Sequence, residues 1–297
     1  MPDTHVTAQS ELAFQYAYAR LLTDSSFREV VLSGAPLEER WQIEPEVAER
    51  LRGLDPERTS LFAELLLGNR LGSLREALPN SAFLLGSRLQ EVVYAFNDSS
   101  PPADHRKYPE ARAFAHYLLD RLEQDSLGPP YLHDVLLYEL SSMQLRLEYD
   151  EPFWLEGAIA SASEFVAALK SGRPVYLHRH PYQAVLSFSY DVERICEKTA
   201  SSRTPTDVNP KPSTILLHVQ AGGVLQQEAI NTATAAFLLA ANGSDSFNRI
   251  VDHLGELFGQ RGRWARLRLR GRVRNLCLEL LQRGIITFTF VPATTMP

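Results

Sequence analysis

The sequence has few of the features from which covalent frameworks, membrane spans and catalytic sites are commonly built. Its 297 residues include two cysteines, Cys196 and Cys277, too few for a disulfide framework or a cysteine-rich metal site. Uninterrupted apolar runs are short, such as FLLAA at 237–241, whereas a membrane-spanning helix needs about 18 apolar residues. The first residues contain no basic stretch followed by an apolar one, so no secretory signal is expected. We therefore expect a protein of the reducing cytoplasm with no membrane partner.

Catalytic and cofactor-binding motifs are also absent from the sequence. It contains no Gly-rich phosphate loop, no G-x-S-x-G elbow and no zinc signature. The two glycines of AGGVLQQEAI precede an expected strand rather than a helix, which suits a turn. Cys196 lies among acidic residues in DVERICEKTA, and these disfavour a reactive thiolate. We expect no catalytic residue, no metal and no cofactor in this chain.

Two histidines, His178 and His180, stand two residues apart in YLHRHPYQAVLSFSY. On an extended strand they would share one face, where imidazoles can bind a metal ion. No Cys, Asp or Glu flanks them on that strand, and the other six histidines are scattered singly. This pattern favours a structural or interface role. An enzyme with a metal at His178 and His180 remains an alternative.

Charge is distributed unevenly along the chain. The net charge is −6, which argues against a nucleic-acid binder as a whole. Residues 260–278 contain no acid, and a local basic patch on an acidic protein suggests one anionic partner at one place. The arginines of this stretch are Arg261, Arg263, Arg266, Arg268, Arg270, Arg272 and Arg274.

Hydrophobic periodicity predicts a helical first half, residues 1–170. Ser10 is the expected N-cap of a helix that runs to Gly34, and Asp55 with Pro56 begins a helix that Pro79 ends. Further helices are expected over 87–96, 111–125, 128–149 and 153–170.

The pattern changes after Pro174, where strand-forming residues alternate with turn residues. A hairpin, three helices and a closing strand follow one another, the order of a winged helix-turn-helix. We therefore predict an α+β protein with a helical domain, 1–170, and a winged-helix-like domain, 171–297. The expected strands are 175–180, 184–190, 215–220, 224–230 and 285–290, and the expected helices are 233–242, 246–259 and 270–284.

Four segments resemble the partner proteins that accompany multinuclear non-haem iron oxidases in the maturation of ribosomal peptide natural products. Residues 55–96 and the loop after them resemble the helical domain of that family, residues 128–144 its next conserved helix, and 177–195 its strand pair, with His180 at a family-like His-Pro. The matching positions are Asn69, Leu74, Ala77, Leu78, Pro79, Leu85, Gly86, Pro101, Pro102, Tyr108, Pro109, Pro130, Tyr131, Leu132, Asp134 and Glu139.

The C-terminal part is similar to the PqqD-like peptide-recognition element, with Gly243 and Ile250 at its signature positions. The combination most resembles the partner of the oxidase of the 3-thiaglutamate pathway, and more distantly that of the methanobactin oxidase. The resemblance implies a non-catalytic subunit. It would bind a ribosomal precursor peptide and form a heterodimer with an iron oxidase, which would hold the iron and modify a peptide residue, expected to be cysteine.

In PqqD-like elements the peptide groove lies between a strand and the last helix, which here implies the strand Val224–Ile230 and the helix around Leu269–Arg283. Arg270 and Arg274 stand four apart on one helical face and would meet acidic side chains of the peptide. A transcription regulator that places the same helix on DNA is the alternative, and a solvated basic face is a third interpretation. The predicted peptide-binding residues are Val224, Leu225, Gln226, Gln227, Ala229, Arg270, Arg274 and Leu278.

Overall fold

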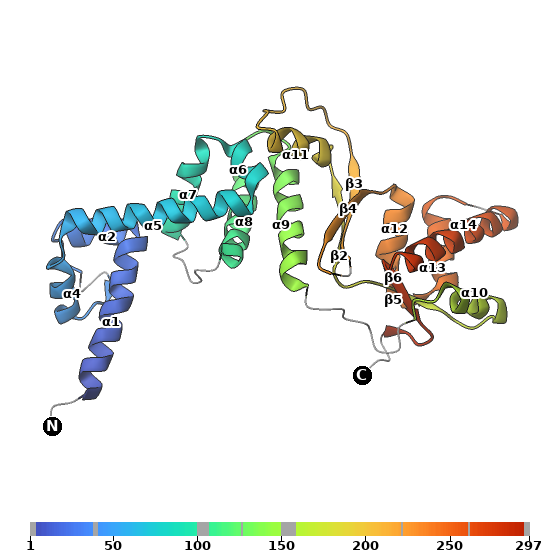
Figure 1. Cartoon of the computed structure of the whole chain (residues 1–297), viewed down its shortest axis with the longest axis horizontal. Helices are drawn as coiled ribbons and strands as arrows, with labels where there is room; N and C mark the ends of the chain where they lie inside the picture. The colour runs from blue at the N-terminus through green and yellow to red at the C-terminus, as the bar shows by residue number, and fades with distance from the viewer. Residues whose placement is uncertain are drawn as a thin grey trace. The chain divides into compact units, whose positions relative to one another are not determined.

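The computed structural model describes residues 4–37, 41–99, 107–125, 127–149, 159–220, 222–260 and 262–293 (Figure 1). They belong to two compact units: Met1–Leu136 with Cys196–Thr204, and Leu137–Ile195 with Pro205–Pro297. The described part combines helices with two three-stranded antiparallel sheets, which confirms the α+β class. The expected domains, 1–170 and 171–297, have different boundaries from these two units. The division into a helical domain and a winged-helix-like domain remains a prediction. No helix in the described part is long and apolar enough to cross a bilayer.

The first unit begins with two helices where the sequence predicted one. α1 (Thr4–Thr23) ends at Asp24, whose side chain accepts a hydrogen bond from the backbone N–H of Phe27 at 2.9 Å and so starts α2 (Ser25–Leu32). Ser10 lies inside α1, so its prediction as an N-cap was wrong. The hydrophobic periodicity continues on both sides of Asp24. Periodicity alone therefore does not reveal that one helix ends and another begins at this residue.

The boundaries of α5 (Pro56–Ala77) follow local signals, as predicted. The Asp55 carboxylate accepts from the backbone N–H groups of Glu57 and Arg58, and Pro79 forces Leu78 out of the helical conformation. The remaining helices of this unit are α4 (Pro45–Arg52), α6 (Pro79–Leu85), α7 (Arg88–Ser99) and α8 (Lys107–Gln124). Pro101 and Pro102 lie outside the described residues.

Two helices belong partly to each unit. α9 (Leu132–Glu148) enters the second unit at Leu137, and α11 (Val192–Ala200) returns to the first unit at Cys196.

The second unit contains both sheets. β1 (Tyr176–Arg179) lies between β5 (Asn242–Ser246) and β6 (Ile286–Thr289), and the other sheet has the order β2 (Gln183–Phe188), β3 (Ser213–Val219), β4 (Leu225–Ala229). The expected pairing of the strands on either side of Pro181 was wrong, because β1 and β2 belong to different sheets. β5 was not predicted, since its sequence NGSDS lacks strand-forming residues and only its pairing with β1 makes it a strand.

Three helices follow the β3–β4 hairpin: α12 (Thr232–Ala240), α13 (Phe247–Leu257) and α14 (Arg263–Gln282). The sequence left the N-cap of α12 open between Asn231 and Thr232, and the structure has Asn231, whose side chain accepts a hydrogen bond of 2.9 Å from the Thr234 N–H. α14 begins seven residues before the predicted start and passes through Gly271.

The helix predicted over 153–170 is shorter in its described part. α10 (Ala162–Ser171) has Ser161 as its N-cap, and Ile159 pairs as a single bridge with Phe288. Residues 153–158 of this prediction lie outside the described residues.

The core of the second unit joins α10, α12, α13 and α14 to the sheet around β1. Phe165 packs against Phe247 and Phe288, with ring centres 5.7 Å apart in both pairs. Leu216 of β3 belongs to the same buried cluster, so β3 is anchored to this core. The edge strand β4 is thereby held beside helices that follow it in the chain.

Candidate functional site

The outer edge of β4 presents unpaired backbone groups. β4 pairs only with β3 among the described residues, and the ladder continues at the Gln220–Val224 and Thr214–Ile230 bonds. Bonded pairs alternate in an antiparallel ladder. The N–H and C=O groups of Leu225, Gln227 and Ala229 therefore point away from β3. The edge can pair with an added extended chain.

Side chains from two helices reach the two faces of β4. On one face the Tyr138 hydroxyl of α9 donates to the side-chain carbonyl of Gln227. On the other face Glu228 forms an ion pair with Arg283, which follows α14, at 2.5 Å. Alternate residues of a strand point to opposite faces, so these two contacts orient the whole strand. The Glu228–Arg283 pair places the end of α14 beside the strand.

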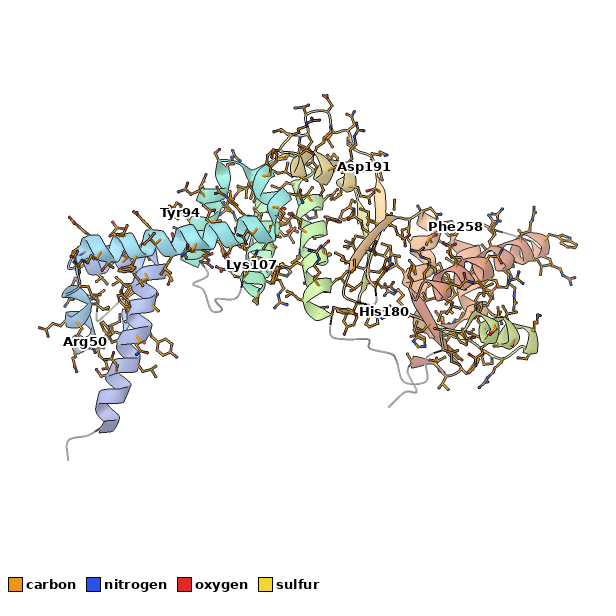
Figure 2. The ribbon with its side chains drawn as sticks, viewed as in Figure 1. Arg50, Tyr94, Lys107, His180, Asp191 and Phe258 are labelled. Carbon is orange, nitrogen blue, oxygen red and sulfur yellow. The ribbon has the colours of Figure 1, made fainter. Side chains whose placement is uncertain are left out.

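A groove of about 690 Å³ lies between α12 and α14, next to the point where β4 ends. Apolar side chains, among them Phe237, Val273 and Leu276, line it, and the guanidinium groups of Arg268 and Arg272 add positive charge. Phe258, labelled in Figure 2, lines the groove from the α13 side. We call it the α12–α14 groove. It offers apolar surface together with two cations.

The arginines of α14 do not share one face. Each residue turns a helix by about 100°, so Arg268 and Arg272 lie roughly opposite Arg270 and Arg274. Arg270 lies toward α13, with its guanidinium carbon 5.8 Å from the centre of the Phe247 ring. Arg274 contacts the neighbouring Asn275 at 3.3 Å. Arg268 and Arg272 line the α12–α14 groove, and Arg270 and Arg274 are not among its lining residues.

The other predicted site residues are placed as follows. Leu225, Gln226, Gln227 and Ala229 lie in β4, and Val224 is exposed at the hairpin turn before it. Leu278 packs against the core of the second unit and is not among the residues that line the α12–α14 groove. The predicted residues thus lie on β4, at the turn before it and on α14, and their role in peptide binding remains a prediction.

Sequence reasoning missed Arg268, Arg272, Arg283, Glu228 and Tyr138 as site residues. A signal for the correct face of α14 was present, because Leu269, Val273, Leu276 and Leu280 recur at helical spacing and mark the covered side. No local signal pointed to Tyr138, which is 89 positions away from Gln227.

His218 of β3 lies close to the Glu228–Arg283 pair. Burial lowers the pKa of His218, the Glu228 carboxylate opposes that shift, and the Arg283 guanidinium adds to it. His218 is therefore neutral at neutral pH. The charges that an approaching peptide meets here come from the ion pair.

His178 and His180 have structural contacts. The Thr289 hydroxyl donates to the Val291 carbonyl at 2.6 Å, so His178 Nε2 is the donor in its 2.8 Å bond to Thr289 Oγ1. His180 Nδ1 accepts from the Tyr182 N–H at 3.3 Å, and burial lowers the pKa of both histidines. Within the described ranges, no group of three or more His, Cys, Asp or Glu residues is arranged to hold a metal ion.

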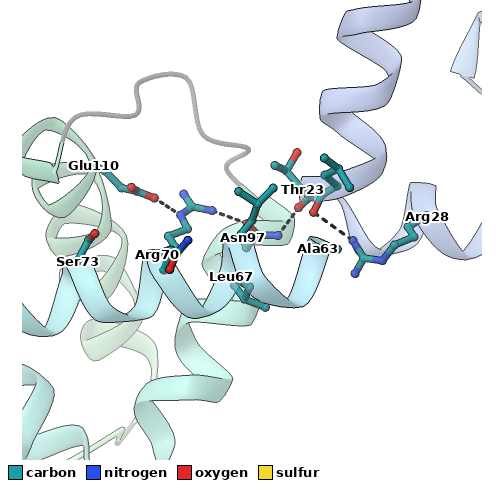
Figure 3. A pocket seen from close by; sticks show the side chains of 11 residues that line it. Thr23, Arg28, Ala63, Leu67, Arg70, Ser73, Asn97 and Glu110 are labelled. Carbon is teal, nitrogen blue, oxygen red and sulfur yellow. Dashed lines mark hydrogen bonds and ion pairs between the residues drawn. The ribbon is translucent and has the colours of Figure 1, made fainter. Parts of the chain in front are cut away.

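A polar pocket of about 190 Å³ lies in the first unit, beside α5 (Figure 3). Arg70 is only 8% exposed, pairs with Glu110 of α8, and donates to the Asn97 side-chain carbonyl of α7 at 2.6 Å. The Asn97 amide in turn donates to the backbone carbonyl of Thr23. This network joins α1, α5, α7 and α8, so we interpret the polar residues that line the pocket as holding these helices together.

The cysteines offer no reactive thiol pair. Cys277 is fully buried in the core of the second unit, and burial raises its pKa well above the usual range. Cys196 is partly buried in α11. A buried thiol that stays protonated is inert as a nucleophile.

No model of a known protein family matches this chain, and no curated protein matches it.

Proposed function

We propose that this protein is a non-catalytic accessory subunit that binds a ribosomal precursor peptide along the edge of β4. In this proposal it forms a complex with a multinuclear non-haem iron oxidase, as in 3-thiaglutamate-type pathways, and the oxidase modifies a cysteine of the bound peptide. The second unit would act as a winged-helix-like, PqqD-like recognition element. The single observation that carries the proposal is the unpaired β4 edge beside a cationic groove.

The geometry of the edge supports strand addition. Leu225, Gln227 and Ala229 direct three N–H and three C=O groups outward, enough to pair with a short extended segment. Main-chain pairing gives affinity with little demand on sequence, so specificity must come from neighbouring side chains. The order of β3, β4, α12, α13 and α14 supports the resemblance to the PqqD-like element.

The α12–α14 groove supports a preference for acidic peptides. Arg268 and Arg272 stand one helical turn apart, so two carboxylates of one peptide can meet both guanidinium groups. The apolar lining can accept an aliphatic side chain that lies on the same face of the peptide, beyond those carboxylates. The preferred segment is therefore rich in both acidic and apolar residues.

Binding on this subunit would bring the modified residue to the oxidase. A peptide held by its leader at one protein and by its core at another gains effective concentration at the active site without additional contacts. In this arrangement the iron and its oxygen chemistry belong to the oxidase. The accessory chain contributes recognition and position.

The central experiment measures binding of a fluorescein-labelled peptide of alternating glutamate and valine by fluorescence polarisation. We expect Arg268→Glu with Arg272→Glu to weaken binding about tenfold or more, the loss of one to two charge-assisted contacts. The matched control is Arg270→Glu with Arg274→Glu, which changes the charge equally on the other face of α14. Equal losses in both variants would remove the α12–α14 groove from the site, and a loss confined to the control would restore the original assignment.

A second pair of variants tests strand addition directly. The N–H of Gln227 points away from β3, so Gln227→Pro removes an outward donor without removing a bond of the β3–β4 ladder. We expect Gln227→Pro to reduce peptide binding and Gln227→Ala to retain it. A peptide N-methylated at consecutive residues, so that neither of its edges keeps its N–H donors, should also fail to bind. Normal binding of the methylated peptide would contradict strand addition.

The remaining parts of the proposal require the native partners. Affinity purification of the full chain from its host should recover a second subunit that contains iron, while the chain alone contains none. The DNA-binding alternative predicts instead a salt-dependent electrophoretic shift with duplex DNA. Such a shift, with no response to the acidic peptide, would replace the proposal by a transcription regulator.

A further inference from the structure

We infer that the opposite side of α14 is a second binding surface, a docking groove for an acidic amphipathic helix of another protein. The groove lies between α13 and α14 and measures about 530 Å³. We call it the α13–α14 groove. It is distinct from the α12–α14 groove, and the inference does not depend on the proposed function. Its lining residues are Asn248, Val251, Asp252, Gly262, Arg263, Arg266, Leu267 and Arg270.

Three arginines line this groove along a single helix face. Arg263, Arg266 and Arg270 are separated by three and four residues, so their guanidinium groups recur about once per turn over roughly 10 Å. None of the ion pairs among the described residues involves any of these three. Their positive charge is therefore available to a partner.

Large apolar side chains stand beside these arginines. Trp264 is 77% exposed and Leu267 is 52% exposed, while Val251 of α13 is buried beneath the groove. Tryptophan and arginine dominate the energetics of protein interfaces, and neighbouring exposed apolar side chains mark a surface that excludes water when a partner binds.

The spacing and charge of the groove identify the occupant. Carboxylates placed three and four residues apart on a helix recur with the same rise per turn as the guanidinium groups of Arg263, Arg266 and Arg270. The leucine face of such a helix would cover Leu267 and Trp264, in the helix-in-groove mode of recognition. A nucleic acid fits less well, because phosphates would leave the exposed apolar side chains of Trp264 and Leu267 uncovered.

The test uses Trp264 as the reporter in a full-length chain with Trp41→Phe and Trp154→Phe. The probe is an acetylated helical peptide with glutamates three and four apart and leucines on the adjacent face. We expect a blue shift of Trp264 emission on binding, and no shift with a peptide of the same composition in scrambled order. Absence of binding, or equal binding of the scrambled peptide, would overturn the inference.

Variants assign the binding to this groove. Arg263→Glu with Arg266→Glu should weaken binding about tenfold or more, whereas Arg75→Glu with Arg112→Glu, the same charge change at exposed arginines of α5 and α8, should leave it unchanged. Circular dichroism checks that both variants remain folded. Equal losses in the two variants would show a general charge effect and contradict the groove. Tighter binding of duplex DNA or of phosphatidylserine vesicles than of the peptide, through Arg263 and Arg266, would overturn the choice of partner.

Discussion

Substituting Gly243 by alanine should destabilise the second unit through contact with His178. Gly243 lies in β5 with φ of +81°, a conformation that residues with a side chain rarely adopt. A Cβ at this position would lie less than 3.0 Å from two ring atoms of His178 and 3.1 Å from Cβ of Ala293. His178 cannot easily move away, because its ring is buried and bonded to Thr289. Gly243 therefore provides the space in which the histidine ring packs.

Two contributions set the free energy of unfolding that Gly243→Ala should remove. A positive φ costs a non-glycine residue roughly 1–2 kcal/mol, and overpacking of a buried site costs roughly 1–3 kcal/mol more. Gly243→Ala should therefore reduce the free energy of unfolding by about 2–5 kcal/mol. Gly284→Ala is the matched control, because Gly284 has φ of +69° but a Cβ at its position would meet no atom within 4 Å. Gly284→Ala should therefore reduce the free energy of unfolding only by the cost of the positive φ, about 1–2 kcal/mol.

Urea denaturation followed by circular dichroism measures both variants, and a double-mutant cycle with His178→Ala locates the contact. In the His178→Ala background the cost of Gly243→Ala should fall to nearly that of Gly284→Ala, because the ring is gone. Equal costs of the two glycine substitutions in the wild-type background would refute the reasoning. An unchanged cost of Gly243→Ala in the His178→Ala background would refute it as well.

Two further predictions concern ionisable groups. Burial lowers the pKa of His178, His180 and His218 below the usual 6.5, so the stability that they contribute is fully present above pH 6.5 and is lost as the pH falls below it. The urea midpoint should decrease from pH 7.5 to pH 5.5, and less steeply in His178→Gln; a flat profile would contradict this. In the first unit, Arg70→Met should cost about 3–5 kcal/mol because it leaves the Glu110 carboxylate unpaired, and adding Glu110→Met should restore much of that loss in the same urea assay. A double variant no more stable than Arg70→Met would count against a charge effect.

Helix boundaries could be predicted wherever a few neighbouring residues decide them. Asp55, Pro56, Pro79 and Asn231 act through their own backbone geometry or through hydrogen bonds to residues two or three positions away. The β3–β4 hairpin was predicted for the same reason, since Gly222 and Gly223 adopt the positive φ values that its turn requires. Asp24 shows the limit of this reasoning, because a strong periodic pattern on both sides concealed its cap.

The candidate site was predicted in part. The strand Val224–Ile230 and the last helix were identified, but the face of that helix was not. Arginines at every second position, from Arg266 to Arg274, fall on two roughly opposite sides of α14. The packing of α12 and α13 against α14 decides what each side borders: Arg268 and Arg272 line one groove, and Arg263, Arg266 and Arg270 line the other.

The sequence by itself determined the α+β class, both ends of α5, the start of α12 and the hairpin, because capping, proline and glycine effects act between near neighbours in the chain. The tertiary structure alone decided that β1 and β2 join different sheets and that β5 is a strand. It also brought Arg70 to Glu110, Tyr138 to Gln227 and Arg283 to Glu228. These contacts join residues that lie tens of positions apart in the sequence. They form only when the surfaces that carry them are buried together, and burial is a property of the folded chain as a whole.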